Sequence, residues 1–157
     1  MGKEQFYKDL EVATKTELDI AELFRENYNA EIVEWRHDNH YDLKIKILDK
    51  TYTIEIKEDF KSAETSNLSI EYSCRGKNSG IMVTKADFYL IKTYYSTEHF
   101  KYLMIPVKTI KRLILDKQYI RKVNGGDIGS NSLSFLFRRE KLQEYAYEIF
   151  KKTLSKQ

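Results

Sequence analysis

The sequence predicts an α/β fold in a single domain, and three observations support this. Residues 4 to 28 place apolar or small side chains at three- and four-residue spacings, which is typical of one buried helix face. Several later segments alternate apolar and polar side chains, as a strand buried on one side does. Pro106 then precedes a second helical pattern that extends to Leu115, where a proline is tolerated in the first turn.

Length and composition limit the class of protein. A chain of 157 residues can bury a sizeable core, and 41% hydrophobic with 13% aromatic residues is far from a disordered composition. The N-terminal residues lack the pattern of a signal peptide, and no charge-free apolar run is long enough to cross a bilayer. The single cysteine, Cys74, has no internal disulfide partner. We therefore expect a soluble cytoplasmic protein without a membrane partner.

The strand candidates follow the first helix in close succession. They are residues 31–35, 41–48, 51–57, 67–74, 88–95, 102–105, 118–123 and 132–137. The second and third are joined through Asp49 and Lys50, which is short enough for a hairpin. Residues 58 to 66 and 75 to 80 are expected to be loop and turn. A short helix or turn is expected at 83–86, and helical spacing recurs from Leu142 through Tyr145, Ala146 and Ile149 to Thr153.

Charge is distributed unevenly along the chain although the net charge is only +3. Residues 1 to 60 hold 15 acidic and 9 basic side chains, whereas residues 61 to 157 hold 9 acidic and 18 basic ones. An acidic centre in a basic surround suits a metal ion and a polyanion, while solvated surface charge is the simpler explanation.

Three acidic residues and one lysine occupy positions that converge in the predicted arrangement. Glu17 lies within the apolar stripe of the first helix, Asp42 opens a strand, and Glu55 and Lys57 share one face of its hairpin partner. Clustered carboxylates repel one another unless a cation lies between them or some are protonated. Mg²⁺ takes oxygen ligands and retains waters, so two protein carboxylates are enough for a site.

Such a set of groups suits hydrolysis of phosphodiesters. The reaction needs a water activated by the metal, neutralisation of charge on the phosphoryl oxygens and help for the leaving alkoxide. Lys57 has two possible tasks: to orient or deprotonate the attacking water, or to stabilise the pentacovalent phosphorus. An exposed strand face with weak surface ion pairs is the alternative interpretation of the same residues.

The spacing of Asp42, twelve intervening residues and then Glu55-Ile56-Lys57, with an acidic residue in the preceding helix, resembles the PD-(D/E)XK nuclease superfamily. The resemblance covers roughly residues 10 to 95. It implies a restriction-endonuclease-like αβββαβ core, with a mixed central sheet flanked by helices. It also implies that Asp42 and Glu55 bind Mg²⁺ or Mn²⁺, that Lys57 is the catalytic lysine, and that Glu17 is the helix-borne acid. The core would span about residues 4 to 106 and a basic C-terminal elaboration residues 107 to 157.

The sequence departs from the family pattern in two places. Tyr41 precedes Asp42 where the family has proline. The helix expected after the strand of Glu55 has no clear counterpart in residues 60 to 80, so either it is displaced to 83–86 or an extra strand is inserted. Glu71 alternates with Ser69 and Ser73 in the following strand, where it either joins the acidic site or faces solvent.

Five basic residues are candidates for contact with a nucleic-acid backbone. Such contacts weaken steeply with salt. The candidates are Arg75 in a turn and Lys111, Arg112, Arg121 and Lys122 in the basic C-terminal part. For any single one of them, a solvated surface position is the simpler explanation.

His37 and His40 lie near Asp38 and Asp42 but lack a second ligand pair with zinc spacing. We expect them to line the approach to the acidic site rather than to bind zinc.

The function expected from the sequence is cleavage of DNA by a Mg²⁺-dependent endonuclease, with a homodimer as a reasonable assembly for two cuts in a duplex. Two alternatives remain open. One is a catalytically inactive nucleic-acid-binding or assembly protein with the same fold. The other is the same active site acting on RNA or on branched DNA junctions, because a fold seldom defines the substrate.

Overall fold

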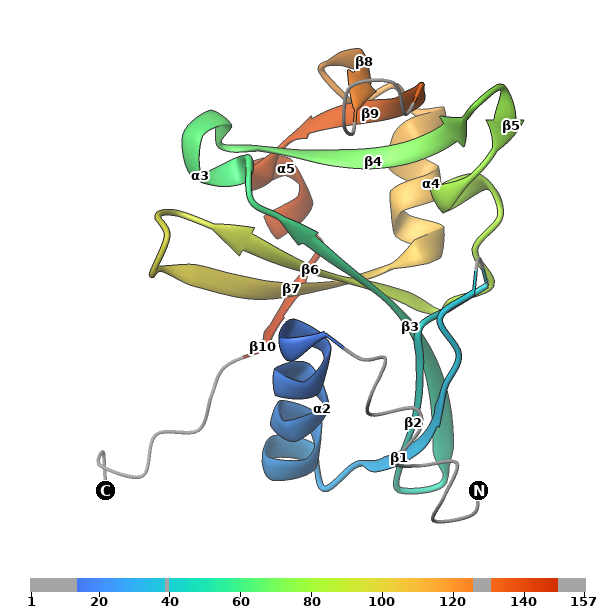
Figure 1. Cartoon of the computed structure of the whole chain (residues 1–157), viewed down its shortest axis with the longest axis vertical. Coiled ribbons are helices and arrows are strands. Elements are labelled where there is room, and N and C mark those ends of the chain that lie inside the picture. The colour runs from blue at the N-terminus through green and yellow to red at the C-terminus, as the bar shows by residue number, and fades with distance from the viewer. Residues whose placement is uncertain (1–13, 39, 126–130, 150–157) are drawn as a thin grey trace.

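The computed structural model describes residues 14–38, 40–125 and 131–149. Two β-sheets and several helices form its layers, as Figure 1 shows. One sheet contains both parallel and antiparallel strands, so the prediction of an α/β fold with a mixed sheet is confirmed. The first part of the predicted helix, residues 4 to 13, lies outside the described residues.

Helix α2 spans Lys15–Tyr28 and begins with a capping box. The Thr14 hydroxyl accepts a hydrogen bond from the Glu17 amide at 3.2 Å, and a Glu17 carboxylate oxygen accepts one from the Thr14 amide at 2.9 Å. These two bonds satisfy amides that have no partner within the helix. Asn29 ends the helix in a left-handed conformation with φ of 52°. The predicted apolar stripe is buried, as Ile20 and Phe24 are each 1% exposed.

The larger sheet, sheet A, has the strand order β1-β2-β3-β6-β7-β10. Strands β3 and β6 run parallel, and the other neighbours run antiparallel. Five of the predicted strands, residues 31–35, 41–48, 51–57, 88–95 and 102–105, are therefore present in this sheet. The first has the predicted ends, and the others have shifted ends. The bounds are Glu31–Trp35 for β1, Leu43–Ile47 for β2, Lys50–Asp59 for β3, Phe88–Tyr94 for β6, Phe100–Pro106 for β7 and Tyr147–Ile149 for β10.

The smaller sheet, sheet B, has the order β5-β4-β9-β8 and is antiparallel throughout. Its strands are β4 at Asn67–Cys74, β5 at Lys77–Asn78, β8 at Arg121–Gly125 and β9 at Ser132–Arg138. The predicted pairing of segments 118–123 and 132–137 is confirmed by β8 and β9. The C-terminal part of the chain thus supplies strands to both sheets.

The chain between β3 and β6 differs from the expected helix. It contains the four-residue helix α3 at Ser62–Thr65, then β4 and β5, and a 3-10 turn at Gly80–Met82. Of the short helix or turn expected at 83–86, the helix is wrong, since only Val83 lies in a turn there, and the alternative of an inserted strand is confirmed. Leu68 and Ile70 are the reason, because their alternation buries both side chains opposite β9.

The predicted C-terminal helix is also wrong. Helix α5 spans only Arg139–Gln143, and β10 follows it as a strand paired with β7. Leu142 and Ile149 are both buried, but they belong to different apolar clusters, so a single helix face does not connect them. Thr153 lies outside the described residues. Helix α4, at Val107–Leu115, follows Pro106 as predicted.

Sheet A separates two apolar clusters. One face, with Ile54 and Leu90, packs against α2. The opposite face, with Tyr89 and Ile91, packs toward sheet B and α4 (Figure 1). Adjacent residues of a strand therefore lie in different clusters, as the period of two requires. None of the helices in residues 14–38, 40–125 and 131–149 is both long and apolar enough to span a bilayer.

Candidate functional site

Asp42 lies directly before β2, at the point where β2 and β3 separate. Its amide donates to the Ile54 carbonyl oxygen at 3.0 Å, and its carboxylate Oδ2 accepts from the Ile56 amide at 2.8 Å. The two contacts on β3 flank Glu55, so the Asp42 carboxylate lies level with that residue. The strand predicted from Tyr41 begins at Leu43, and Asp42 bonds β3 through its amide and also through its side chain.

Glu55 and Lys57 point from β3 toward the face of sheet A that carries Tyr89. Lys57 Nζ lies 3.1 Å from Glu55 Oε2. Glu55 is 9% exposed, whereas the Lys57 side chain is 44% exposed and reaches solvent. The other carboxylate oxygen, Glu55 Oε1, is buried and has no hydrogen-bond partner among the described residues. A buried acceptor without a partner costs about 1–3 kcal/mol.

The environment raises the pKa of both carboxyl groups above their ordinary values. Burial is the main cause for Asp42, and the charge of Glu17 adds to it. Burial is also the main cause for Glu55, where the charge of Asp42 adds to it and Lys57 opposes it. The structure therefore brings Asp42, Glu55 and Lys57 together and places Glu17 within electrostatic range of Asp42.

Glu17 is already engaged by its neighbours. Besides capping α2, its Oε2 lies 2.7 Å from His37 Nε2. His37 has a left-handed backbone conformation with φ of 50°, which is uncommon for a residue with a side chain, and stacks on Trp35 at 5.6 Å between ring centroids. Glu17 thus lies beside the acidic pair, but the capping box and His37 occupy its oxygens.

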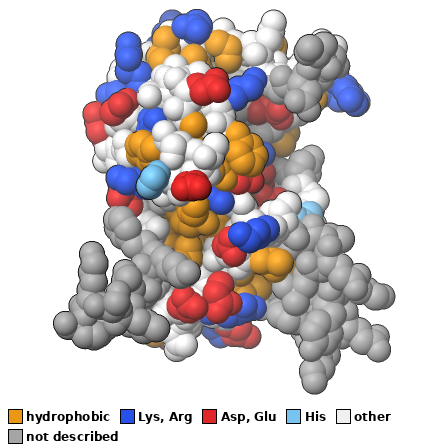
Figure 2. Space-filling model, turned by 60° about the vertical axis from the view of Figure 1, so that its left-hand side comes forward, with side chains coloured by type: hydrophobic (Ala, Val, Ile, Leu, Met, Phe, Trp, Pro, Cys, Tyr) orange, Lys and Arg blue, Asp and Glu red, His pale blue; other side chains and the backbone are white. Residues whose placement is uncertain are grey.

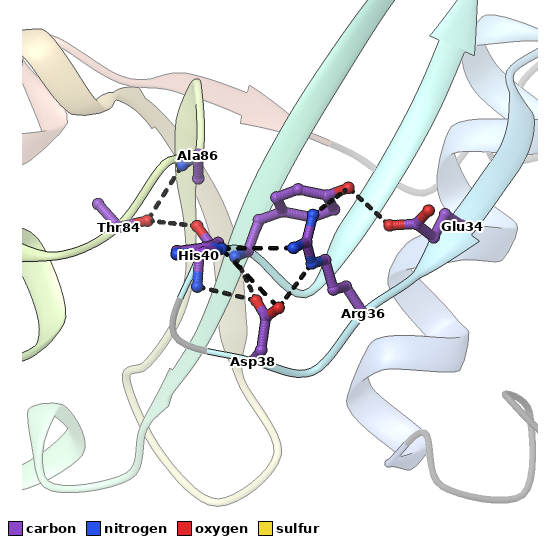
Figure 3. Close-up of polar contacts among 7 residues, drawn as sticks. Glu34, Arg36, Asp38, His40, Thr84 and Ala86 are labelled. Atoms are coloured by element: carbon purple, nitrogen blue, oxygen red, sulfur yellow. Dashed lines mark hydrogen bonds and ion pairs between the residues drawn. The ribbon is translucent and has the colours of Figure 1, made fainter.

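The loop between β1 and β2 is held by the polar contacts drawn in Figure 3. Arg36 Nε lies 2.5 Å from Asp38 Oδ2, and the Arg36 amide donates to the Asp42 carbonyl at 2.8 Å. The His40 carbonyl accepts from Thr84 Oγ1 at 2.9 Å, which ties the loop to the segment before β6 (Figure 3). These bonds fix the backbone that leads into Asp42.

The two histidines have different partners within this part of the chain. His37 bonds Glu17, whereas His40 Nδ1 lies 3.9 Å from Asp38 Oδ2. His37 lies at the acidic site, because its charge acts on the Asp42 carboxyl group. This arrangement gives no support to a zinc site.

Two further residues lie near the acidic pair. Tyr89 on β6 is the parallel-strand partner of Glu55, and its phenol is buried without a hydrogen-bond partner among the described residues. Burial chiefly, and then the charges of Glu55, Glu71 and Asp42, raise the pKa of Tyr89. Glu71 therefore lies within electrostatic range of the phenol. The sequence showed Tyr89 only as part of an aromatic strand, since nothing local reveals its pairing with Glu55.

The five basic candidates come from three separate parts of the fold. All five are exposed. Lys111 and Arg112 lie on α4, Arg75 lies in the turn after β4, and Arg121 and Lys122 lie on β8, where adjacent side chains point to opposite faces. Lys122 Nζ lies 5.8 Å from the ring centroid of Phe135. In Figure 2, Lys and Arg side chains are scattered over the upper end of the molecule among apolar and acidic ones.

The side chains at the site limit which divalent ion it could hold. In the parts of the chain that the structure describes, no three His, Cys, Asp or Glu side chains are arranged to hold a metal ion together. Two carboxylates, Asp42 and Glu55, lie within electrostatic range of each other, and Glu55 has a buried oxygen without a hydrogen bond among the described residues. This set fits a hard ion that keeps several waters, such as Mg²⁺, and does not fit an ion that needs a complete protein cage.

Comparisons with known proteins identify no relative of this chain. No protein-family model matches the chain, and no curated protein or solved structure is significantly similar to it.

Proposed function

We propose that this protein is a Mg²⁺- or Mn²⁺-dependent endonuclease that hydrolyses DNA phosphodiester bonds with a PD-(D/E)XK type of active site. The observation that carries the proposal is the Asp42 carboxylate, held on β3 level with Glu55, whose Oε2 lies 3.1 Å from Lys57 Nζ. Two partly desolvated carboxylates at one place destabilise a fold unless a cation lies between them. Such a costly pair is therefore a candidate for a functional site.

The arrangement of the elements gives secondary support. Helix α2, then β1, β2 and β3, then a strand parallel to β3 follow the αβββαβ order except at one element. Strands β4 and β5 of sheet B occupy the part of the chain where that order has its second helix. The inserted strands leave Asp42 and Glu55 on adjacent elements, so the departure from the order does not disturb the pair.

Each residue of the site has a distinct task in this proposal. Asp42 and Glu55 would hold the ion, which would polarise the phosphoryl oxygens and lower the pKa of a bound water. Lys57 is the exposed member of the group and the partner of a carboxylate. An ion pair uses the ammonium form, which suits stabilisation of the charged phosphorane oxygens better than removal of a proton from water. Glu17 acts on Asp42 by its charge and holds His37.

A second candidate function is a catalytically inactive protein that binds nucleic acid or assembles with other chains. It is favoured by the lack of a three-ligand metal group among the described residues and by the engagement of Glu17 with Thr14 and His37. The exposed basic residues serve this candidate as well as they serve a nuclease.

One assay separates the candidates. The purified protein is incubated with linear, nicked, branched and single-stranded DNA and with RNA, in Mg²⁺, Mn²⁺ or EDTA, beside Asp42→Ala and Lys57→Ala. Cleavage of duplex DNA that needs the metal and both residues supports the proposal. Cleavage of RNA or branched DNA alone changes the substrate class and keeps the chemistry. Binding without cleavage in every condition supports the inactive candidate, and cleavage unaffected by both substitutions assigns the activity elsewhere.

A further inference from the structure

Tyr89 occupies the centre of the candidate site without an evident structural task for its hydroxyl group. The residue is 1% exposed, and its ring belongs to the apolar cluster between sheet A and sheet B. A phenylalanine would fill the same apolar space and would bring no polar atom into the cluster. Tyrosine hydroxyls that are buried usually have a hydrogen-bond partner.

The phenol and Glu55 are neighbours on adjacent parallel strands. Glu55 pairs with Tyr89 in the register of β3 and β6, so both side chains leave the sheet on the same face. Tyr89 OH and Glu55 Oε1 are two of the four buried side-chain atoms that lack a hydrogen bond within the described residues. One is a donor and the other an acceptor, and each would cost about 1–3 kcal/mol if left unsatisfied.

We propose that Tyr89 is a positioning residue of the site, whose hydroxyl shares one buried water with Glu55 Oε1 and so fixes the orientation of that carboxylate. Such a water makes hydrogen bonds to both atoms and removes both penalties. Lys57 holds the other oxygen, Oε2, at 3.1 Å. With both oxygens restrained, the carboxylate has one rotamer, which is the condition for a ligand that binds an ion at defined geometry.

The effect of this water on metal binding rests on the proposed function. The water bridge between Tyr89 and Glu55 does not depend on that function. Two measurements therefore separate the claims. The first is a double-mutant cycle of Tyr89→Phe and Glu55→Ala in EDTA, in which the free energy of unfolding is measured with urea. The second is the dissociation constant of Mn²⁺, measured by calorimetry for the wild type and for Tyr89→Phe.

Tyr94→Phe is the matched control. Tyr94 is on the same strand and 7% exposed, and its hydroxyl donates to Glu58, which faces away from the site. We expect the effects of Tyr89→Phe and Glu55→Ala on the free energy of unfolding to be non-additive, because either substitution alone already breaks the water bridge. We also expect about tenfold weaker Mn²⁺ binding in Tyr89→Phe, with no change in Tyr94→Phe.

Additive effects in the cycle would overturn the inference, as would Mn²⁺ binding in Tyr89→Phe as tight as in the wild type. If the wild type binds no Mn²⁺ at all, the proposed function fails, and the cycle alone then decides whether Tyr89 and Glu55 share the water. Non-additive effects in the cycle, together with Mn²⁺ binding that is weaker in Tyr89→Phe and unchanged in Tyr94→Phe, support both the shared water and its role in metal binding.

Discussion

The Asp42 carboxylate accepts a hydrogen bond from the Ile56 amide of β3 through its Oδ2 at 2.8 Å, one residue before β2 begins at Leu43. This bond anchors a carboxylate on β3, level with Glu55, and the Arg36 amide holds the same residue by its carbonyl oxygen. The site therefore depends on a local irregularity of the sheet, as functional sites often do.

We predict that Asp42→Asn stabilises the metal-free protein by about 0.5–1 kcal/mol at pH 7. The asparagine oxygen still accepts from Ile56, but the buried charge that the Asp42 and Glu55 groups share is reduced. Because the folded-state pKa of Asp42 is raised, the folded protein binds the proton more tightly than the unfolded chain, and stability falls as pH rises through that range. The gain should vanish below about pH 4 and grow toward neutrality.

Urea unfolding of the wild type and Asp42→Asn at several pH values tests this prediction. Asp49→Asn, at an exposed turn position, is the matched control and should show no such pattern. A wild type that is more stable than Asp42→Asn at pH 7 in EDTA would show that the Asp42 charge stabilises the fold.

We predict that Lys57→Ala lowers the cleavage rate about 10²–10³-fold, as the loss of one group that stabilises transition-state charge does. Mn²⁺ binding should change much less, because the carboxylates remain. Lys50→Ala, at the exposed start of the same strand, is the control. Single-turnover cleavage with saturating metal gives the rate, and an unchanged rate in Lys57→Ala would remove this residue from the chemistry.

Gly80 allows the chain to pass close to β4. Its φ is +52°, and a Cβ atom there would lie 2.9 Å from the Glu71 carbonyl carbon. We predict that Gly80→Ala costs more than about 2 kcal/mol of unfolding free energy, through both backbone strain and the clash. Gly76→Ala should cost only about 1 kcal/mol, because Gly76 has a similar positive φ of +78° but open space around it. Equal losses in the two variants would contradict the role assigned to the close approach.

We predict that basic residues of sheet B contribute to nucleic-acid binding and that this contribution weakens as the salt concentration rises. If Lys122 contacts a phosphate, Lys122→Ala should lower the slope of log affinity against log salt by about 0.9. Lys46→Ala, exposed on β2, is the control. Fluorescence anisotropy with duplex DNA at several salt concentrations measures the slope, and an unchanged slope in Lys122→Ala would place the DNA elsewhere.

The early strands could be predicted because alternation is a local pattern. Leu43 and Ile45 alternate with polar residues and are buried, as is Ile54 in the next strand. The hairpin that joins these strands also predicts that Asp42 and Glu55 lie close together. Leu142 and Ile149 misled the prediction because helical spacing over a short segment also fits a helix followed by a strand.

Other features depend on contacts between distant segments. Glu55 meets Tyr89 through the parallel pairing of β3 and β6, and Glu17 meets His37 across the junction of α2 and the β1–β2 loop. No local pattern in the sequence carries such register information, because the segments between β3 and β6 decide which strands become neighbours.

In the proposed function, Asp42 and Glu55 together hold a divalent ion. The most direct test is calorimetric titration of Mn²⁺ into the wild type, Asp42→Asn and Glu55→Gln, each first freed of metal with EDTA and then dialysed. We predict saturable binding to the wild type that is weakened at least about tenfold in both variants. The absence of binding to the wild type, or equal binding by all three proteins, would contradict the claim.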